Sequence, residues 1–349
     1  LLFLFIGLFC LDLFYRSQTD IEEIIGYGRE YLAICCCFSF GIFTQVMFER
    51  LLQATGKTIY TMFTQGIGAI VNIILDPIMI FGLWGVPKMG VAGAAAATVI
   101  GQMVAGILSV WLNHTKNHEV HIQMKGFRPD RQVIAQIYGI GVPSIIMQAI
   151  GSVMNYGMNR ILISFTSTAT AVFGVYFKLQ SFVFMPVFGL NNGVIPIVAY
   201  NYGAKNAERV LSTIRHSIFY AMSIMLLGLV VFQAIPGQLL ILFNASDTMV
   251  GIGIPALRII SLSFVLAGFC IACGSVFQAL GRSVYSMLVS VARQLVVLLP
   301  AAYALSRLGN VDLVWWSIPI AELMSLAMTI YFMVKVDRKV LAKIRTAAR

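Results

Sequence analysis

Long apolar runs dominate the chain, and short polar stretches separate them. The runs cover residues 1–15, 31–54, 58–83, 90–112, 133–165, 170–199, 208–235, 253–280, 284–305 and 312–334. A helix needs about 20 apolar residues to cross the hydrocarbon core of a bilayer, and backbone groups in lipid must pair internally. The runs do not alternate in hydropathy as the strands of a barrel would. The pattern therefore predicts an all-α polytopic membrane protein with ten transmembrane helices.

Composition supports this class and excludes others. Of the 349 residues, 59% are hydrophobic and 11% are charged, whereas soluble domains are about 25% charged. A soluble enzyme, a disordered protein and a nucleic-acid binder are thereby excluded, and the lipid bilayer becomes the expected partner. The net charge is +10, and most basic residues fall in segments on one side, including 113–132 and 337–349. Because cytoplasmic loops carry excess Lys and Arg, we interpret 113–132 as a cytoplasmic linker and 337–349 as a basic cytoplasmic tail of a multi-pass protein in the plasma or inner membrane.

A polar turn occurs twice. Residues 53–62 read QATGKTIYTM and residues 278–287 read QALGRSVYSM, and five of the ten positions are identical when Gly56 is aligned with Gly281. Both glycines suit left-handed helix C-caps. Since an even number of spans separates the copies, we expect a parallel repeat.

The repeat predicts a larger architecture. The fifth run, 133–165, would be the first helix of the second half. In the register that aligns Gly56 with Gly281, its counterpart in the first half would lie before residue 1, so we expect the first half to lack two helices. The fold would then be a twelve-helix protein of two six-helix lobes. Residues 1–112 would form the last four helices of the first lobe, and residues 133–336 would form the second lobe.

Two like halves around a midplane cavity are typical of secondary transporters, and ionisable groups inside spans mark their ion pathways. Asp76 lies inside the third run, and Asn72 precedes it by one helical turn, so both share a face. A buried carboxylate beside an amide can hold a proton or a sodium ion. The alternative is a structural Asp at the kink that Pro77 introduces.

Further polar residues in the spans are candidates for other roles. Lys178 is an isolated cation that either lines a cavity or pairs with Glu322, while Arg293 and Glu322 form a structural ion pair in the simplest interpretation. Glu49 would stabilise the end of its span. The remaining candidates for a cavity lining are Gln148, Asn155 and Asn191. The cysteines show no metal-ligand spacing, so we expect no metal site and no cofactor besides the coupling ion.

Several segments resemble one family. LLQATGKTIYTM, VNIILDPIMIFGL, GVAGAAAATVIGQ and VAYNYGAKN are similar to the multidrug and toxic compound extrusion (MATE) transporters, and GIGVPSIIMQAIGSVMN is similar to their MepA-like bacterial branch. The resemblance implies export of cationic or amphipathic drugs in exchange for H⁺ or Na⁺, and we expect the protein to be a monomer. The resemblance also implies a cation site on an Asn-x-x-x-Asp pair, matched by Asn72 and Asp76, with Thr98 as the candidate for a threonine of the next helix. Acids that a NorM-like branch uses in its seventh and tenth helices have no counterpart in 133–165 and 253–280.

Two other functions remain open at this point. A lipid-linked oligosaccharide flippase of the same superfamily would need a strongly cationic cavity, which Lys178 and Arg293 alone could supply. A non-transporting membrane scaffold would not need the buried polar groups Asn72, Asp76 and Lys178. We expect no enzyme activity in any of the three cases.

Overall fold

The computed structural model describes residues 2–16, 22–120, 128–338 and 342, and every regular element in these ranges is helical. The prediction of an all-α protein is therefore confirmed. The chain divides into two compact units, residues 1–127 (unit 1) and 128–349 (unit 2). Residues 121–127 of the expected linker and most of the expected tail lie outside the described residues.

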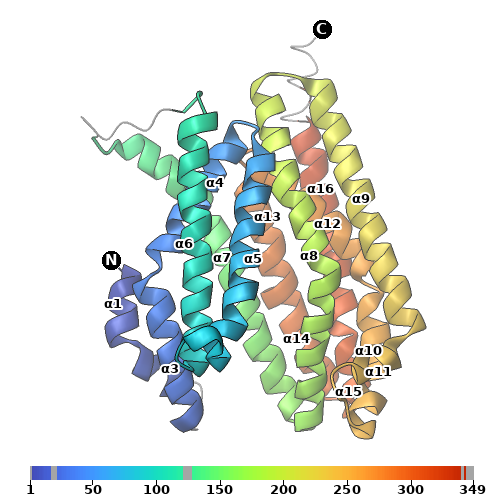
Figure 1. Ribbon diagram of the computed structural model, residues 1–349. Helices are drawn as coiled ribbons and strands as arrows, with labels where there is room; N and C mark the ends of the chain where they lie inside the picture. The colour runs from blue at the N-terminus through green and yellow to red at the C-terminus, as the bar shows by residue number, and fades with distance from the viewer. Residues whose placement is uncertain (1, 17–21, 121–127, 339–341, 343–349) are drawn as a thin grey trace. The chain divides into compact units, whose positions relative to one another are not determined.

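Unit 1 consists of helices that pack largely against one long helix, α6. Its elements are α1 (Leu2–Phe9), α2 (Leu11–Arg16), α3 (Glu22–Cys37), α4 (Phe40–Ala54), α5 (Thr58–Phe81), the 3₁₀ turn η1 (Leu83–Gly85) and α6 (Gly90–Lys116). Helices α3, α4 and α5 all contact α6, which is drawn in teal in Figure 1.

Unit 2 is larger and has its own apolar core. Its elements are α7 (Arg131–Ile163), α8 (Ser167–Gly203), α9 (Ala207–Ala234), α10 (Pro236–Ile241), α11 (Asp247–Ser261), α12 (Phe264–Ala279), α13 (Ser283–Val291), the π-helical stretch η2 (Ala292–Leu298), α14 (Leu299–Ser306), α15 (Val311–Trp315) and α16 (Ser317–Val336). Fully buried side chains such as Phe173, Phe264 and Trp315 belong to this core.

Nine of the ten predicted runs reappear as helices of membrane-spanning length in the described ranges. Seven are single helices, and two are pairs, α3–α4 and α11–α12, bent by 50° and 48°. The first run forms α1 and α2, each much shorter than a span. Hydropathy averages over a window, so it predicts an apolar run without revealing a break inside it. The predicted number of ten spans is thus not confirmed.

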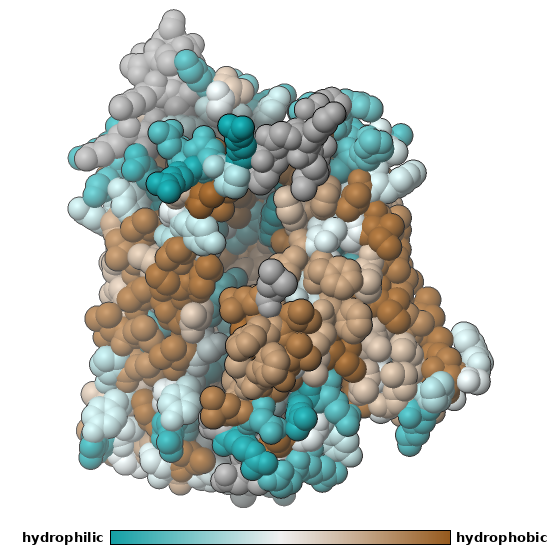
Figure 2. Space-filling view, turned by 90° about the vertical axis from the view of Figure 1, so that its left-hand side faces the viewer, coloured by the Kyte–Doolittle hydropathy of each residue, from teal (hydrophilic) through white to brown (hydrophobic). Residues whose placement is uncertain are grey.

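The helices expose apolar side chains, as a lipid-facing protein does. Only 11% to 39% of each single span is buried inside the protein. Figure 2 shows hydrophobic residues in the middle of the visible face and hydrophilic residues at its upper and lower ends. This distribution matches a hydrocarbon layer between two aqueous boundaries.

The internal repeat is visible in the helix boundaries. The register that aligns Gly56 with Gly281 also carries α2 onto α10, α3 onto α11, and α5 onto the continuous helix 283–306. Gly56 and Gly281 are both left-handed, with φ of +76° and +70°. In each copy the next N–H donates to the carbonyl five residues earlier, at 2.8 and 2.7 Å, which is the pattern of a Schellman C-cap.

Candidate functional site

In unit 1, small residues bring α5 and α6 unusually close together. Gly93, Ala97, Gly101 and Ala105 recur every four residues on one face of α6, and both alanines are fully buried. A Cβ atom added at Gly101 would lie 2.7 Å from the carbonyl oxygen of Gly68 on α5. Close backbone approach at such small-residue faces is a common way for membrane helices to associate.

This close approach places the polar side chains of α5 beside α6. Asn72 Nδ2 donates to Asp76 Oδ1 at 3.2 Å and lies 3.5 Å from Thr98 Oγ1. Thr98 donates its hydroxyl proton to the carbonyl of Ala94 at 2.9 Å. All three cluster residues are half-buried. The structure therefore brings together Asn72, Asp76 and Thr98, which the sequence and the resemblance singled out separately.

The chemistry of this cluster suits a small cation. Within the described ranges, Asp76 forms no salt bridge, so no basic side chain neutralises its carboxylate. The hydroxyl of Thr98 gives its proton to a backbone carbonyl, so Oγ1 acts as an acceptor: one lone pair faces the amide of Asn72 at 3.5 Å, and the other can face a cation. Carboxylate, hydroxyl and amide oxygens are the ligands of hard cations, and a carboxylate alone can take up a proton.

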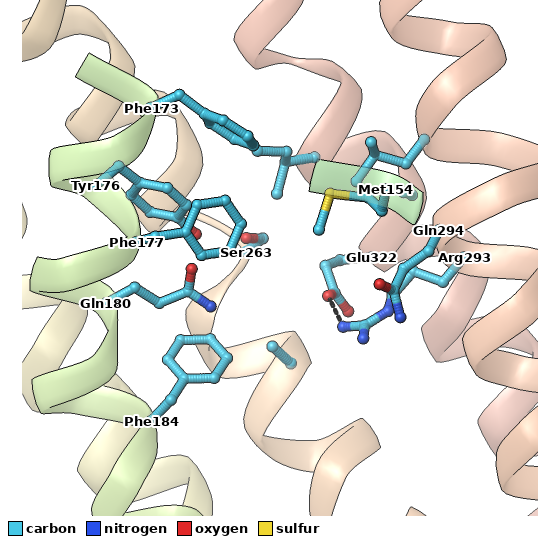
Figure 3. A pocket seen from close by; sticks show the side chains of 14 residues that line it. Met154, Phe173, Tyr176, Phe177, Gln180, Phe184, Ser263, Arg293, Gln294 and Glu322 are labelled. Atoms are coloured by element: carbon cyan, nitrogen blue, oxygen red, sulfur yellow. Dashed lines mark hydrogen bonds and ion pairs between the residues drawn. The ribbon is translucent and has the colours of Figure 1, made fainter. Parts of the chain in front are cut away.

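Unit 2 contains a cavity of about 90 Å³ between α7, α8, α12, η2 and α16. Figure 3 shows the aromatic rings of α8, Phe173, Tyr176, Phe177 and Phe184, along one side of the cavity, with Met154 of α7 above its other side. Phe173 and Tyr176 are almost fully buried. One wall of the cavity is therefore an aromatic surface.

The opposite wall is charged. Arg293 Nη1 donates to Glu322 Oε1 at 2.5 Å, and the side chains are 25% and 7% exposed. Glu322 Oε2 is buried and has no hydrogen-bond partner in the described part of the chain. Gln180 Oε1, on the aromatic wall, is in the same situation. The cavity thus contains two buried acceptors that have no donor.

The two units carry their polar sites on equivalent helices but at different positions. In the register that aligns Gly56 with Gly281, Asn72 and Asp76 correspond to Val297 and Ala301, and Arg293 corresponds to Gly68. Moreover, α5 is α-helical throughout, whereas η2 interrupts its counterpart. The two units therefore share a helix arrangement but carry different polar residues at different positions on it.

The other candidates occupy different places. Lys178 is exposed, and its Nζ lies 5.9 Å from the ring centroid of Phe243. A pair between Lys178 and Glu322 is wrong, because Arg293 on the facing helix is the ion partner of Glu322. None of the cavity candidates lines the unit 2 cavity: Gln148 is exposed, Asn155 is half-buried, and Asn191 is buried with Oδ1 lacking a partner among the described residues.

Sequence reasoning missed the environment of Glu49. This carboxylate is 3% exposed. It accepts hydrogen bonds from Gln45 Nε2 at 3.0 Å, Thr64 Oγ1 at 2.8 Å and Gln65 Nε2 at 2.8 Å. The donors come from both α4 and α5, so Glu49 ties the two helices together. Thr64 and Gln65, in FTQ at 63–65, were polar residues in a span that could have indicated a partner for Glu49. Because they lie far from Glu49 along the chain, the sequence did not connect them with it.

Replacing Glu49 with Leu should lower the free energy of unfolding by about 1–3 kcal/mol, because the buried hydroxyl of Thr64 and the half-buried amide of Gln45 lose their acceptor. Glu49→Gln should cost less, since its carbonyl oxygen still accepts. Thermal unfolding in detergent micelles would measure both, with Glu30→Leu at an exposed position of α3 as the control. Equal stability of the Glu49→Leu and Glu30→Leu variants would contradict the structural role.

Comparison with known proteins identifies a family and relatives of this chain. A family model described as MatE matches residues 1–78 and 143–304. The multidrug export protein MepA of Staphylococcus haemolyticus (strain JCSC1435) is 28% identical over 300 residues, which is 86% of this chain and 65% of that protein. MepA of Staphylococcus aureus (strain bovine RF122 / ET3-1) is 25% identical over 324 residues, covering 91% of this chain and 70% of the relative. The chain thus spans about 65% of the length of the first of these relatives.

Solved structures share the fold. A multidrug resistance MATE family transporter of the MOP superfamily in an outward-facing conformation has a TM-score of 0.87 at 24% identity, with 99% of this chain and 77% of that chain covered. A MOP superfamily transporter from Pyrococcus furiosus has a TM-score of 0.88 at 23% identity, with the same coverage.

Proposed function

The chain belongs to the MatE family, whose model covers more than half of its residues, and from this membership we propose that it acts in a secondary active exporter of cationic and amphipathic compounds. Its relatives of similar sequence are named multidrug export proteins. These names describe transport and not enzyme catalysis.

The observation that carries the proposal is the polar cluster on α5 and α6. Asn72 lies within hydrogen-bond reach of both Asp76 and Thr98, and no basic group neutralises Asp76 in the described ranges. Such a carboxylate in a membrane span is costly unless it serves a cation. We assign the cluster to the coupling ion, H⁺ or Na⁺, that drives export by exchange.

A flippase for lipid-linked oligosaccharides fits the structure less well. Its pyrophosphate would need free positive charge, but Glu322 neutralises Arg293 at 2.5 Å. Lys178 alone is left, in contact with an aromatic ring. A pure scaffold would gain nothing from an unneutralised Asp76 in a span.

The distribution of basic residues supports a location in the plasma membrane with the C-terminus in the cytoplasm. The positive charge of the 113–132 segment and of the residues after α16 supports a cytoplasmic side for both. The chain would function as a monomer.

Vesicles that contain the protein test the proposed function directly. Each vesicle is loaded with a fluorescent organic cation, and a pH gradient or a sodium gradient is imposed separately. Export should follow one of the two gradients and stop when an ionophore collapses it. Equal efflux with and without both gradients would contradict secondary active transport, and the gradient that drives export identifies the coupling ion.

A further inference from the structure

The unit 2 cavity combines an aromatic wall with a carboxylate of which only one oxygen is hydrogen-bonded in the described part of the chain. Glu322 is 5% exposed, Oε1 bonds to Arg293, and Oε2 has no donor within the described ranges. Across the cavity, Gln180 presents a second acceptor for which the described part of the chain offers no donor (Figure 3). Buried polar atoms are nearly always paired. Glu322 Oε2 and the amide oxygen of Gln180 are therefore two acceptors that a bound donor would satisfy.

We propose that the cavity is a binding subsite for the ammonium group of an organic cation, and that this group displaces Arg293 from Glu322. The ammonium N–H groups donate to Glu322 and Gln180. The carbon substituents pack against the faces of Phe177 and Phe184, which attract a cation through the ring quadrupole. The inference rests on the proposed export function, because it assigns part of the exported molecule to a defined place.

Charge balance explains why Arg293 is the displaced group. A buried carboxylate without a counter-ion is strongly unfavourable, so Glu322 needs one cation at all times. Arg293 supplies it while the cavity is empty. Because the Arg293 side chain is 25% exposed and that of Glu322 only 7%, the guanidinium can withdraw toward the more exposed side while the carboxylate stays inside. The cavity then remains neutral with and without the ligand.

The backbone under Arg293 fits such a movement. Arg293 and Gln294 lie in the π-helical stretch 292–298, and the equivalent helix α5 has no such stretch. π-Helical turns are rare, and they frequently occur at functional sites. Reversion of this stretch to an α-helix would rotate Arg293 relative to α16 without breaking the span.

The volume selects the size of the group. The cavity of about 90 Å³ is much smaller than the roughly 300–1,000 Å³ of pockets that enclose a whole drug-sized ligand. It therefore accommodates the charged head of an amphipathic cation, a nitrogen with one or two carbon atoms, while the rest of the molecule lies elsewhere. Ethylammonium matches this head, and ethanol is a neutral hydrogen-bond donor of the same heavy-atom count.

Saturation-transfer NMR of ethylammonium with the full chain in nanodiscs tests the proposal, because this method detects the weak binding of very small ligands. We expect saturable binding of ethylammonium to the wild type and at least tenfold weaker binding to the Arg293→Gln/Glu322→Gln double variant, whose neutral pair keeps the shape of the wall. Arg293→Gln alone should bind ethylammonium at least tenfold more tightly, since the competing guanidinium is gone. If the single variant does not fold, the wild type and the double variant decide the question.

Three results would overturn the proposal. Undiminished binding to the double variant would place the ligand elsewhere, binding of ethanol as strong as that of ethylammonium would remove the charge requirement, and displacement by sodium at equal concentration would make the site one for simple cations. Asp247→Asn serves as the control, because Asp247 is exposed in the first turn of α11, away from the cavity lining, and this variant should bind ethylammonium like the wild type. The measurement uses no ion gradient, so it can succeed even if gradient-driven export fails.

Discussion

Replacing Asp76 with Asn is expected to reduce gradient-driven efflux to the background rate of empty vesicles. The substitution keeps the size of the side chain and its hydrogen bond with Asn72, but it removes the negative charge that would hold H⁺ or Na⁺. Without a coupling cation the exchange cycle has no driving force, since an ion shifts a conformational equilibrium only through its different affinity for the two states.

The measurement is the initial rate of efflux from vesicles that carry equal amounts of each variant. Asp247→Asn, at an exposed position in the first turn of α11, is the matched control and should retain the wild-type rate. An Asp76→Asn variant with the full wild-type rate under the driving gradient would refute the assigned role of this carboxylate.

The second large effect concerns the stability of unit 2. Arg293→Gln should lower the free energy of unfolding by about 3–5 kcal/mol, because it leaves the carboxylate of Glu322 buried without its charged partner. The value should fall near the lower end, since the Arg293 side chain is 25% exposed. Chemical denaturation in detergent micelles, followed by circular dichroism, measures the change.

The double variant Arg293→Gln/Glu322→Gln separates lost charge pairing from lost packing. Two amides of similar volume can hydrogen-bond to each other, so most of the lost stability should return. A single Arg293→Gln variant as stable as the wild type would show that Glu322 finds another counter-ion, and an equally unstable double variant would show that packing, not charge, is responsible.

The apolar runs predicted most of the helices because a span is a local property. Twenty apolar residues must be helical in lipid whatever surrounds them, and the boundaries of α5 and α9 accordingly lie within two residues of the runs 58–83 and 208–235. The bends at the middle of 31–54 and 253–280 were not predicted, since the residues at the breaks, 38–39 and 262–263, include neither proline nor glycine. Asn72 and Asp76 could be placed on one face because helical periodicity alone determines that relation.

Contacts between residues on different helices could not be predicted in this way. Glu322 could be matched from the sequence with either Lys178 or Arg293, and only the packing of η2 against α16 selected Arg293. The donors to Glu49 and the aromatic wall of the cavity were hidden for the same reason. The sequence by itself determined the membrane class, the repeat and the face of each helix, which depend on neighbours along the chain. The tertiary structure decided which faces meet, because contacts between helices arise from the fit of small and large side chains that lie far apart in sequence.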